Sequence, residues 1–528
     1  MKTTRSLLAL AALAACACTA PAATFVFESA TIEDINKAFD AGALTAEKLT
    51  QMCLDRIAAY DGTLNAVIAV NPKALEIARA LDAERKQKGP RSPLHGIPVA
   101  LKDNFDTFDV PTTGGSYLLK DSIPPDDAFT VKKLRDAGAI IFAKVNLSEF
   151  ASGGARSSII GQSRNPHALD RTPAGSSGGT GVAIAASYAP LGLGTDTGGS
   201  IRGPSTSNGI VGLKPTHGLM SRDGIIPLAL TYDTGGPMTR SVYDIAVSLG
   251  VMTGVDPADE ATKKSEGKFH RDYVQFLKKD ALKGARIGIA RDFLGADPDV
   301  DWVIESSLSA MRAAGATIVD VRYPKWLLDA RSEWYNAIRR PEFVAQIADY
   351  LATLKPGYPK NHDDLIKMSE KLMARSPEGF TPNQPRWNLM KEEAKSGNLQ
   401  SVNYLMVRDH ALPLVRTTLE AIMKEHKVDA IVYPTNPRRP ALIDAPSGAA
   451  AAAGGVSSAT NFANLSGFPD LIVPAGFTAS GLPVGISFFG PAFSEPKLLA
   501  LGYSFEQATK SMRPPVHAPA LPGETINY

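Results

Sequence analysis

Serines and glycines gather in one block of the chain, at residues 172–205. Two loops dense in glycine and hydroxyl residues, at 175–181 and 194–199, bracket one apolar segment at 182–193. Because glycine has no Cβ, such loops let backbone N–H groups turn toward a ligand and approach it closely. A pair of flexible linkers is the alternative, but an enclosed apolar segment argues against it. The block therefore predicts a built site that contains serine hydroxyls.

The rest of the residue inventory excludes several other kinds of catalytic site. Neither loop has the lysine of a phosphate-binding P-loop, and the glycines do not follow a first strand as in a dinucleotide-binding fold. A G-x-S-x-G elbow with a later acid and histidine is also missing near these loops. The histidines are scattered singly, without the clustered ligands of a zinc site, and each is interpreted as structural: His95, His167, His217, His270, His362, His410, His426 and His517.

A lysine offers the base that a serine nucleophile needs. An unactivated hydroxyl is a poor nucleophile, so a neighbouring group must accept its proton. Lys102 stands at the end of the apolar run 98–101, where burial would lower the pKa of its amine enough to populate the neutral form. The backbone at 197–200 could supply the converging N–H donors that the oxyanion of an acyl transfer requires. This combination indicates serine catalysis with a non-histidine base.

These motifs resemble those of the amidase signature family of serine amidohydrolases. The resemblance rests on six segments in family order: LKDN (101–104), AGSSGG (174–179), GTDTGGSIR (194–202), GLKPT (212–216), DTGGP (233–237) and LPVGI (482–486). It implies an α/β fold, a single large α/β/α domain around a central mixed, mostly parallel twisted sheet, at residues 27–515. It also implies that no metal and no organic cofactor takes part.

The resemblance assigns roles to three residues, which are spaced as in the family. Ser200 would be the nucleophile that accepts the acyl group. Ser176 would relay its proton and would follow an unusual cis peptide bond from Gly175. Lys102 would be the base that starts the relay and later delivers a proton to the leaving amine. Ser177 is the competing choice for the relay serine.

The resemblance also implies supporting groups around the nucleophile. The backbone N–H groups of Thr197, Gly198 and Gly199 would form the oxyanion hole. Asp196 and Arg202 would pair with each other and brace this turn without touching substrate.

The chain departs from the family pattern at three positions. Ala174 stands where glycine is common, and Thr180 where serine or alanine is frequent. Neither change removes a catalytic atom, so we still expect activity. Gly203 replaces a residue that is often larger, which could widen the pocket for the acyl group.

Composition is that of an ordinary globular enzyme, with 44% hydrophobic and 21% charged residues. The net charge of +2 and the dispersed basic residues give no indication of nucleic-acid binding. The three cysteines, Cys16, Cys18 and Cys53, define no disulfide framework, and Cys53 is expected to be a small buried apolar residue. Residues 445–455 have the composition of a low-complexity alanine and glycine loop.

The first 22 residues have the pattern of an export signal. Basic residues precede a short apolar run that is too brief to span a bilayer. An A-x-A site at 20–22 predicts cleavage after Ala22 and a free periplasmic or secreted protein. A lipobox at 13–16 is the alternative, in which Cys16 becomes a lipidated N-terminus anchored to the membrane. The sequence leaves both open.

Helices and strands alternate over two parts of the chain, which predicts a largely parallel sheet. A helix at 128–137 precedes a strand at 139–144, and a strand at 286–290 precedes a helix at 300–314. The alternation is lost at 323–400, which holds three of the four tryptophans. We interpret this stretch as a mostly helical insertion that could wall or cover the site, with plain peripheral packing as the alternative.

These observations favour an exported amidase. It would hydrolyse carboxylic amide C–N bonds of small-molecule or peptide substrates through an acyl-enzyme, as a monomer or homodimer, and release a carboxylate plus ammonia or an amine. Carbamate, aryl-acylamide or ester hydrolysis at the same residues is an alternative. Two others are the glutaminase subunit of a tRNA-dependent amidotransferase, which the export pattern argues against, and an inactive binding module. The presence of Lys102, Ser176 and Ser200 together argues against the last.

Overall fold

The computed structural model describes residues 23–444 and 458–528. The predicted export segment, with Cys16 and Cys18, and the loop at 445–455 lie outside these residues. The two described ends of the chain are joined, because β1 (Thr24–Val26) pairs antiparallel with β15 (Thr525–Asn527). None of the helices described is long and apolar enough to cross a membrane.

A single sheet of eleven strands runs through the described part of the chain, in the order β11-β10-β12-β14-β13-β8-β9-β7-β3-β4-β2. Its strands are β2 (Val67–Val70), β3 (Pro98–Lys102), β4 (Ile140–Val145), β7 (Leu191–Asp196), β8 (Val211–Lys214), β9 (Thr234–Thr239), β10 (Arg286–Ala290), β11 (Thr317–Val321), β12 (Ala430–Pro434), β13 (Asp470–Phe477) and β14 (Pro483–Phe489). A separate small ribbon is formed by β5 (Arg156–Ser157) and β6 (Gly161–Gln162). The strands β3, β7 and β8 are fully buried, as their mostly apolar sequences require.

The sheet is mixed, as expected, but it is not mostly parallel. Four pairings are parallel: β10 with β11 and β12, and β3 with β4 and β7. The other six, which include all those in the middle of the sheet, are antiparallel. The parallel pairs β3–β4 and β10–β11 join strands that are consecutive in the chain, and a helix between the two strands of each pair supplies the crossover that parallel strands need.

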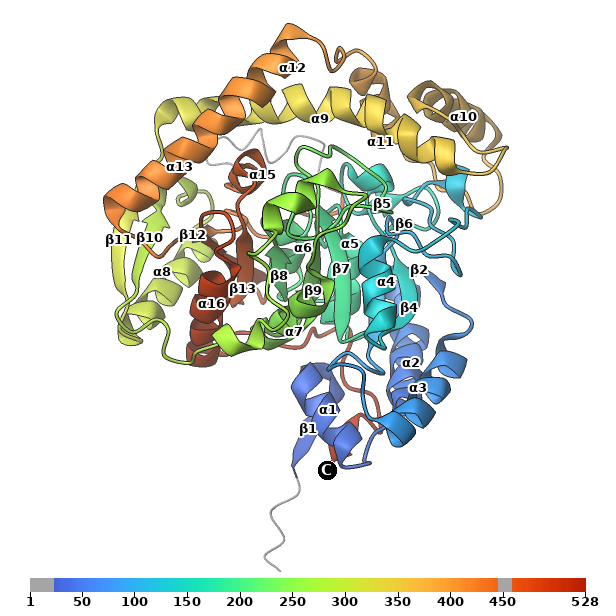
Figure 1. Ribbon diagram of the computed structural model, residues 1–528, viewed down its shortest axis with the longest axis vertical. Helices are drawn as coiled ribbons and strands as arrows, with labels where there is room; N and C mark the ends of the chain where they lie inside the picture. Colours follow the sequence, from blue (N-terminus) through green and yellow to red (C-terminus); the bar gives the residue numbers. More distant parts are fainter. Residues whose placement is uncertain (1–22, 445–457) are drawn as a thin grey trace, which may run out of the picture.

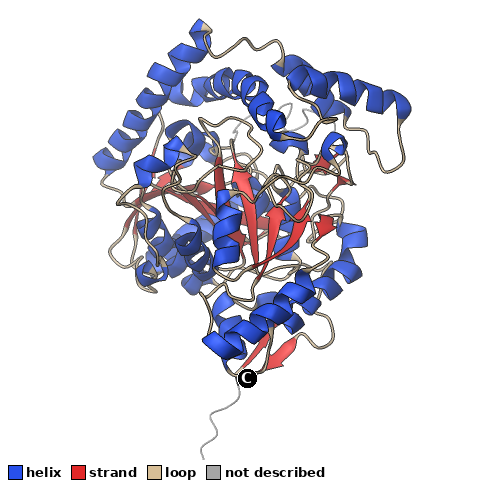
Figure 2. Cartoon of the chain, turned by 45° about the vertical axis from the view of Figure 1, so that its right-hand side comes forward, coloured by secondary structure: helices blue, strands red, loops and turns tan. Residues whose placement is uncertain are grey.

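Helices surround this sheet and complete an α/β single domain (Figure 2). They are α1 (Ile32–Asp40), α2 (Ala46–Leu64), α3 (Ala74–Lys88), α4 (Phe129–Asp136), α5 (Gly178–Ala185), α6 (Arg202–Ser207), α7 (Val242–Met252), α8 (Pro298–Ala313), α15 (Asn461–Ser466) and α16 (Glu495–Thr509). Thr31 caps α1 in a reciprocal capping box with Asp34, and Thr45 caps α2.

A further set of helices arches over one edge of the molecule, at the top of Figure 1. It consists of α9 (Lys325–Thr353), α10 (His362–Arg375), α11 (Gln384–Glu393), α12 (Val402–Met406) and α13 (Leu412–His426). Buried apolar residues of α9, among them Phe343 and Ile347, form a core cluster with Phe150 and Ile226 from the loops of the main domain. This packing holds α9 against the loops that follow the strands.

The glycine-rich block differs from its sequence-based description. The apolar segment at 182–193 is not one element, because it is divided between α5 and β7. Four residues of the first predicted loop, from Gly178 to Gly181, already belong to α5. A Cβ at Gly179 would lie 2.3 Å from the backbone O of Asn146. Glycine is therefore needed there for close packing of a helix on neighbouring backbone and not for a loop.

Candidate active site

Lys102 ends β3, a strand inside the sheet between β7 and β4, and its side chain is fully buried. Its Nζ lies 2.7 Å from Ser176 Oγ and 2.6 Å from Thr195 Oγ1. Burial lowers the pKa of Lys102 to about 7, and the more remote charges of Asp196 and Asp233 only partly oppose this shift. A substantial fraction of this amine is therefore neutral near pH 7 and able to accept a proton.

Ser176 lies in the loop that leads into α5, and the peptide bond that joins it to Gly175 is cis. The serine is 1% exposed, and its carbonyl oxygen accepts a hydrogen bond from the N–H of Ser148 at 3.0 Å. These contacts fix the loop at the position where its hydroxyl meets the amine of Lys102.

The hydroxyl of Ser177, the competing relay residue, makes its hydrogen bonds with the backbone of Thr195 and not with Lys102. Its Oγ donates to the carbonyl oxygen of Thr195 at 3.2 Å and accepts the N–H of the same residue at 3.3 Å. These contacts tie α5 to the end of β7. The geometry therefore favours Ser176 over Ser177 as the partner of Lys102.

Ser200 lies between β7 and α6, and it is the partly exposed serine of the group. It lines a pocket of about 270 Å³ together with Gly175, Gly198 and Gly199. Its carbonyl oxygen accepts the N–H of Ser177 at 3.1 Å, which joins the two serine loops. Within the described residues no hydrogen bond joins the hydroxyls of Ser200 and Ser176, so transfer of a proton between them stays a prediction.

The predicted oxyanion hole is only partly available in this structure. The N–H of Gly199 donates to Asp196 Oδ1 at 2.9 Å. The N–H groups of Thr197 and Gly198 have no protein acceptor in the part of the chain that the structure describes. The side chain of Thr197 is held by Asp233, because its hydroxyl donates to that carboxylate. Thr197 and Gly198 therefore remain the candidate donors to an oxyanion, while Gly199 is engaged in holding the turn.

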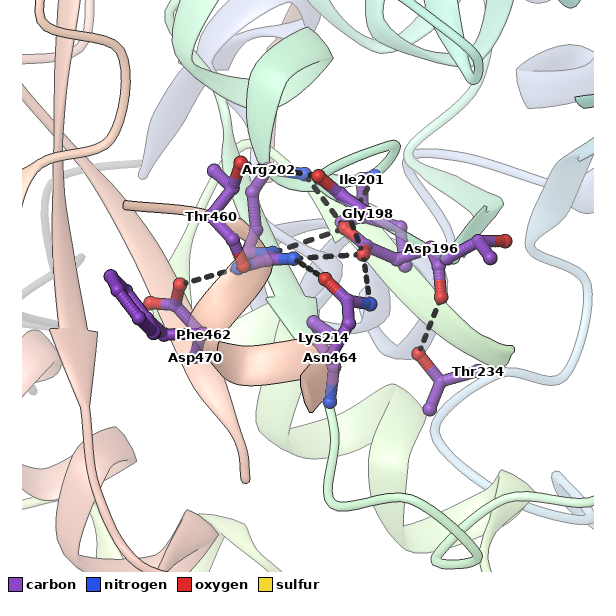
Figure 3. Close-up of polar contacts among 12 residues, drawn as sticks. Asp196, Gly198, Ile201, Arg202, Lys214, Thr234, Thr460, Phe462, Asn464 and Asp470 are labelled. Carbon is purple, nitrogen blue, oxygen red and sulfur yellow. Dashed lines mark hydrogen bonds and ion pairs between the residues drawn. The ribbon is translucent and has the colours of Figure 1, made fainter. Parts of the chain in front are cut away.

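Asp196 and Arg202 form a buried ion pair that closes this turn (Figure 3). Arg202 Nη2 lies 2.9 Å from Asp196 Oδ1, and Arg202 Nη1 lies 3.1 Å from Asp470 Oδ2. Burial by itself would raise the pKa of Asp196, but the Arg202 charge and hydrogen bonds from Arg202, Asn464 and the Ile201 N–H hold that pKa well below its usual range. The carboxylate therefore stays ionised and fixes the backbone on both sides of Ser200.

Sequence reasoning did not assign several residues of the site. Thr195 lies inside a recognised motif, but only the fold shows that it faces Lys102. Asn464 and Asp470 come from the C-terminal part of the chain, more than 260 positions away, and both bind Arg202. A buried arginine needs anionic or polar partners, but the sequence alone does not identify which residues they are.

The helical insertion contacts the site through Tyr335 of α9. Its ring stacks on Tyr232 with centroids 5.5 Å apart. A Cβ at Gly198 would lie 2.7 Å from the Tyr335 hydroxyl oxygen, so this position must be glycine while the tyrosine lies there. Tyr335 also lines the pocket beside Ser200. The insertion thus forms one wall of the pocket, and no local pattern in the sequence pointed to this tyrosine.

Gly203 lines the pocket beside Ser200, and the widening of the acyl pocket at this position stays a prediction. A Cβ added there would meet the Cβ of Ala174 and the carbonyl oxygen of Gly175, each at 3.8 Å, which is ordinary contact. Ala174 has φ = +61°, and it lines the same pocket as Gly203.

Comparisons with known proteins define the class. Residues 48–499 match the family model Amidase, and the chain belongs to this family of amidohydrolases. Among solved structures, the native peptide amidase from Stenotrophomonas maltophilia is similar, with a TM-score of 0.84, 38% identity, and coverage of 93% of this chain and 99% of that one.

Two curated relatives show the breadth of the family. A glutamyl-tRNA(Gln) amidotransferase subunit from Geobacter sp. (strain M21) is 36% identical over 485 residues, which are 91% of this chain and 97% of the relative. A probable amidase from Arabidopsis thaliana is 34% identical over 508 residues, 93% of this chain and 92% of the relative. The family membership thus rests on likeness along nearly the whole chain.

Proposed function

We propose that this protein hydrolyses carboxylic amides through an acyl-enzyme on Ser200, with Lys102 as the base and Ser176 as the relay. The observation that supports this most strongly is the hydrogen-bond distance of 2.7 Å between Lys102 Nζ and Ser176 Oγ. It places an amine with a pKa of about 7 against the serine whose loop is joined to that of the nucleophile.

The reaction follows from these positions. Ser200 Oγ attacks the amide carbon while its proton passes to Ser176 Oγ, whose own proton passes to Lys102 Nζ. Thr197 and Gly198 N–H groups stabilise the oxyanion. The C–N bond then breaks, and the nitrogen takes a proton back along the same relay. A water molecule then attacks the ester while its proton passes through Ser176 to Lys102. The C–O bond to Ser200 breaks, Ser200 Oγ takes that proton back along the relay, and the carboxylate is released.

Peptide amides are the substrate class that we put first. The likeness to a solved peptide amidase along 93% of the chain supports this choice. The pocket wall also offers polar groups for a peptide-like acyl chain, among them Tyr335, Asn436 and Thr460. Residues 1–22 support export to the periplasm or beyond, with a lipid anchor at Cys16 if cleavage precedes that residue.

Labelling with a fluorophosphonate probe tests the nucleophile. We expect the purified protein to be labelled at Ser200, and the Ser200→Ala variant to lose labelling and at least about 10⁴-fold of its amidase activity. Ser177→Ala is the matched control, because its hydroxyl contacts only the backbone of Thr195, and it should still be labelled. A Ser200→Ala protein that is labelled as strongly as the wild type would end the proposal.

Glutamine hydrolysis is a second candidate, because a glutamyl-tRNA(Gln) amidotransferase subunit is among the relatives. A panel of peptide amides, anilides, fatty amides, carbamates and glutamine separates the two. We expect the highest kcat/KM with peptide amides. A preference for glutamine would favour the second candidate and leave the assignment of Ser200 intact.

A further inference from the structure

A cleft of about 720 Å³ shares none of its lining residues with the pocket beside Ser200. Its walls include the short 3₁₀ helix Glu260–Ser265 with Lys268, the helices α13 and α15, and residues from the segment 216–231. The helices α13 and α15 pack against each other (Figure 1). We call this cavity the basic cleft, after Lys264, Lys268 and Arg416, which line it.

These three cations have no carboxylate partner among the described residues. Arg416 makes one hydrogen bond, from Nε to the carbonyl oxygen of Ser466 at 3.1 Å, and Lys268 Nζ lies over the Phe493 ring, 4.4 Å from its centroid. Lys264 donates to no described residue. The guanidinium Nη atoms and both ammonium groups are therefore available to a ligand.

The remaining charges around the basic cleft are already paired. Asp259 binds Arg222, and Asp409 binds Arg408 with both of its oxygens. Glu260, the acid that lines the cleft, forms an ion pair with Lys263 outside it. Among the described residues, the cleft consequently keeps an excess of positive charge with no protein anion left to neutralise it.

Electrostatics within the basic cleft agree with this excess. Burial lowers the pKa of Lys264, and the charges of Arg416 and Arg222 lower it further, against the smaller opposing effect of Asp259. Like charges held around one concave surface repel each other, and they concentrate anions there. The walls are partly apolar, with Phe493 and Leu412, so the site offers contact to a carbon skeleton as well as to a charge.

We propose that the basic cleft binds the oxyanion of a small organic ligand, a carboxylate or a phosphate, between Lys264 and Arg416. Ser466, which anchors Arg416, is the last residue of α15. The same helix carries Asn464, which binds both Asp196 and Arg202. The ligand therefore contacts the helix that braces the Ser200 turn, at a site separate from the acyl pocket.

Calorimetric titration of the full chain tests this site, with inorganic phosphate in one arm and succinate in the other, at constant ionic strength. We expect saturable one-site binding in at least one arm. In the double variant Lys264→Gln/Arg416→Gln the affinity should fall at least tenfold. The control double variant Lys278→Gln/Lys283→Gln removes the same number of charges from exposed lysines that do not line the cleft, and it should bind as the wild type does.

Each outcome bears on the proposal. Binding of phosphate alone, succinate alone or both, lost in the double variant, supports the oxyanion site and identifies its chemistry. No saturable binding in either arm overturns it. Equal weakening in Lys278→Gln/Lys283→Gln and in Lys264→Gln/Arg416→Gln overturns it as well, because the effect would then come from net charge. Far-UV circular dichroism and thermal unfolding confirm that the variants, which change exposed side chains, are folded.

Discussion

Lys102 and Arg202 are both fully buried basic residues near the same turn, but their pKa values shift in opposite directions. Arg202 contacts two carboxylates, those of Asp196 and Asp470, and it remains charged because they hold its pKa above the ordinary value despite burial. Lys102 contacts the hydroxyls of Ser176 and Thr195, and its pKa falls to about 7 because burial dominates. The partners decide which cation stabilises a turn and which can exchange a proton.

A third cation, Lys214, shows that a lowered pKa is not enough to make a base. It is buried, and burial followed by the charge of Arg202 lowers its pKa to about 7. Its Nζ donates to the carbonyl oxygens of Pro215 and Phe468, at 2.8 and 2.9 Å. Neither acceptor has a proton to give. Lys102 differs by facing a serine hydroxyl next to the nucleophile's loop.

Among the variants that test this comparison, Lys102→Met should show the largest loss of catalytic activity. The variant keeps the volume of the side chain but removes the proton acceptor, so we expect kcat/KM to fall by about 10²–10⁴-fold. Amide hydrolysis under pseudo-first-order conditions measures it. Near-normal activity in a folded Lys102→Met protein at neutral pH would show that another group accepts the proton.

Arg202→Met should produce the largest loss of stability. It leaves Asp196 and Asp470 buried without their cation, which costs about 3–5 kcal/mol in the free energy of unfolding. Urea denaturation measures this change. Adding Asp196→Asn to the same chain removes one of the orphaned charges and should recover part of the loss. No recovery would mean that Asp196 does not depend on Arg202 for compensation.

Lys214→Met should affect stability and leave catalysis nearly unchanged. With a pKa near 7 in the folded chain and about 10.4 when unfolded, Lys214 is protonated more fully in the unfolded state between these values. Its contribution to stability therefore rises with pH across that window, by at most about 1.4 kcal/mol per pH unit. Denaturation of the two proteins at several pH values should show a shallower rise in the variant. A loss of activity like that of Lys102→Met would erase the distinction between the two lysines.

Gly203→Ala should have the smallest effect. Its methyl group would make only ordinary contacts at 3.8 Å, and alanine favours the helix α6 that contains it. Stability should change by less than about 1 kcal/mol. Because the methyl narrows the pocket, KM should rise several-fold for bulky acyl groups and not for small ones. Equal kinetics across acyl sizes would place the acyl chain elsewhere.

The local pattern of the chain predicted the elements better than their arrangement. Helix–strand alternation identified α4 with β4 and α8 with β10, and the strands around these helices are parallel. The central pairings of β8, β9, β13 and β14 are antiparallel: β8–β9 and β13–β14 join strands that follow each other in the chain, and β8–β13 joins segments that are distant in sequence. The alternation of helices and strands along the chain does not indicate these antiparallel pairings. The sheet was therefore predicted to be more parallel than it is.

For the site, residue types were predictable and cross-chain contacts were not. A lysine at the end of an apolar strand implied burial and a lowered pKa, and Lys102 shows both. The contacts of Arg202 with Asn464 and Asp470, and of Tyr335 with the Gly198 turn, depend on long-range packing. No spacing rule connects residues more than a hundred positions apart.

The pH dependence of kcat/KM tests the central claim, that neutral Lys102 is the base, most directly. The amine is active when deprotonated, so kcat/KM of the wild type should rise with pH through a limb near its pKa of about 7. The Lys102→Met variant should lack this limb, while Lys214→Met should retain it. A limb that persists unchanged in Lys102→Met, or a wild-type profile that is flat across neutral pH, would contradict the account.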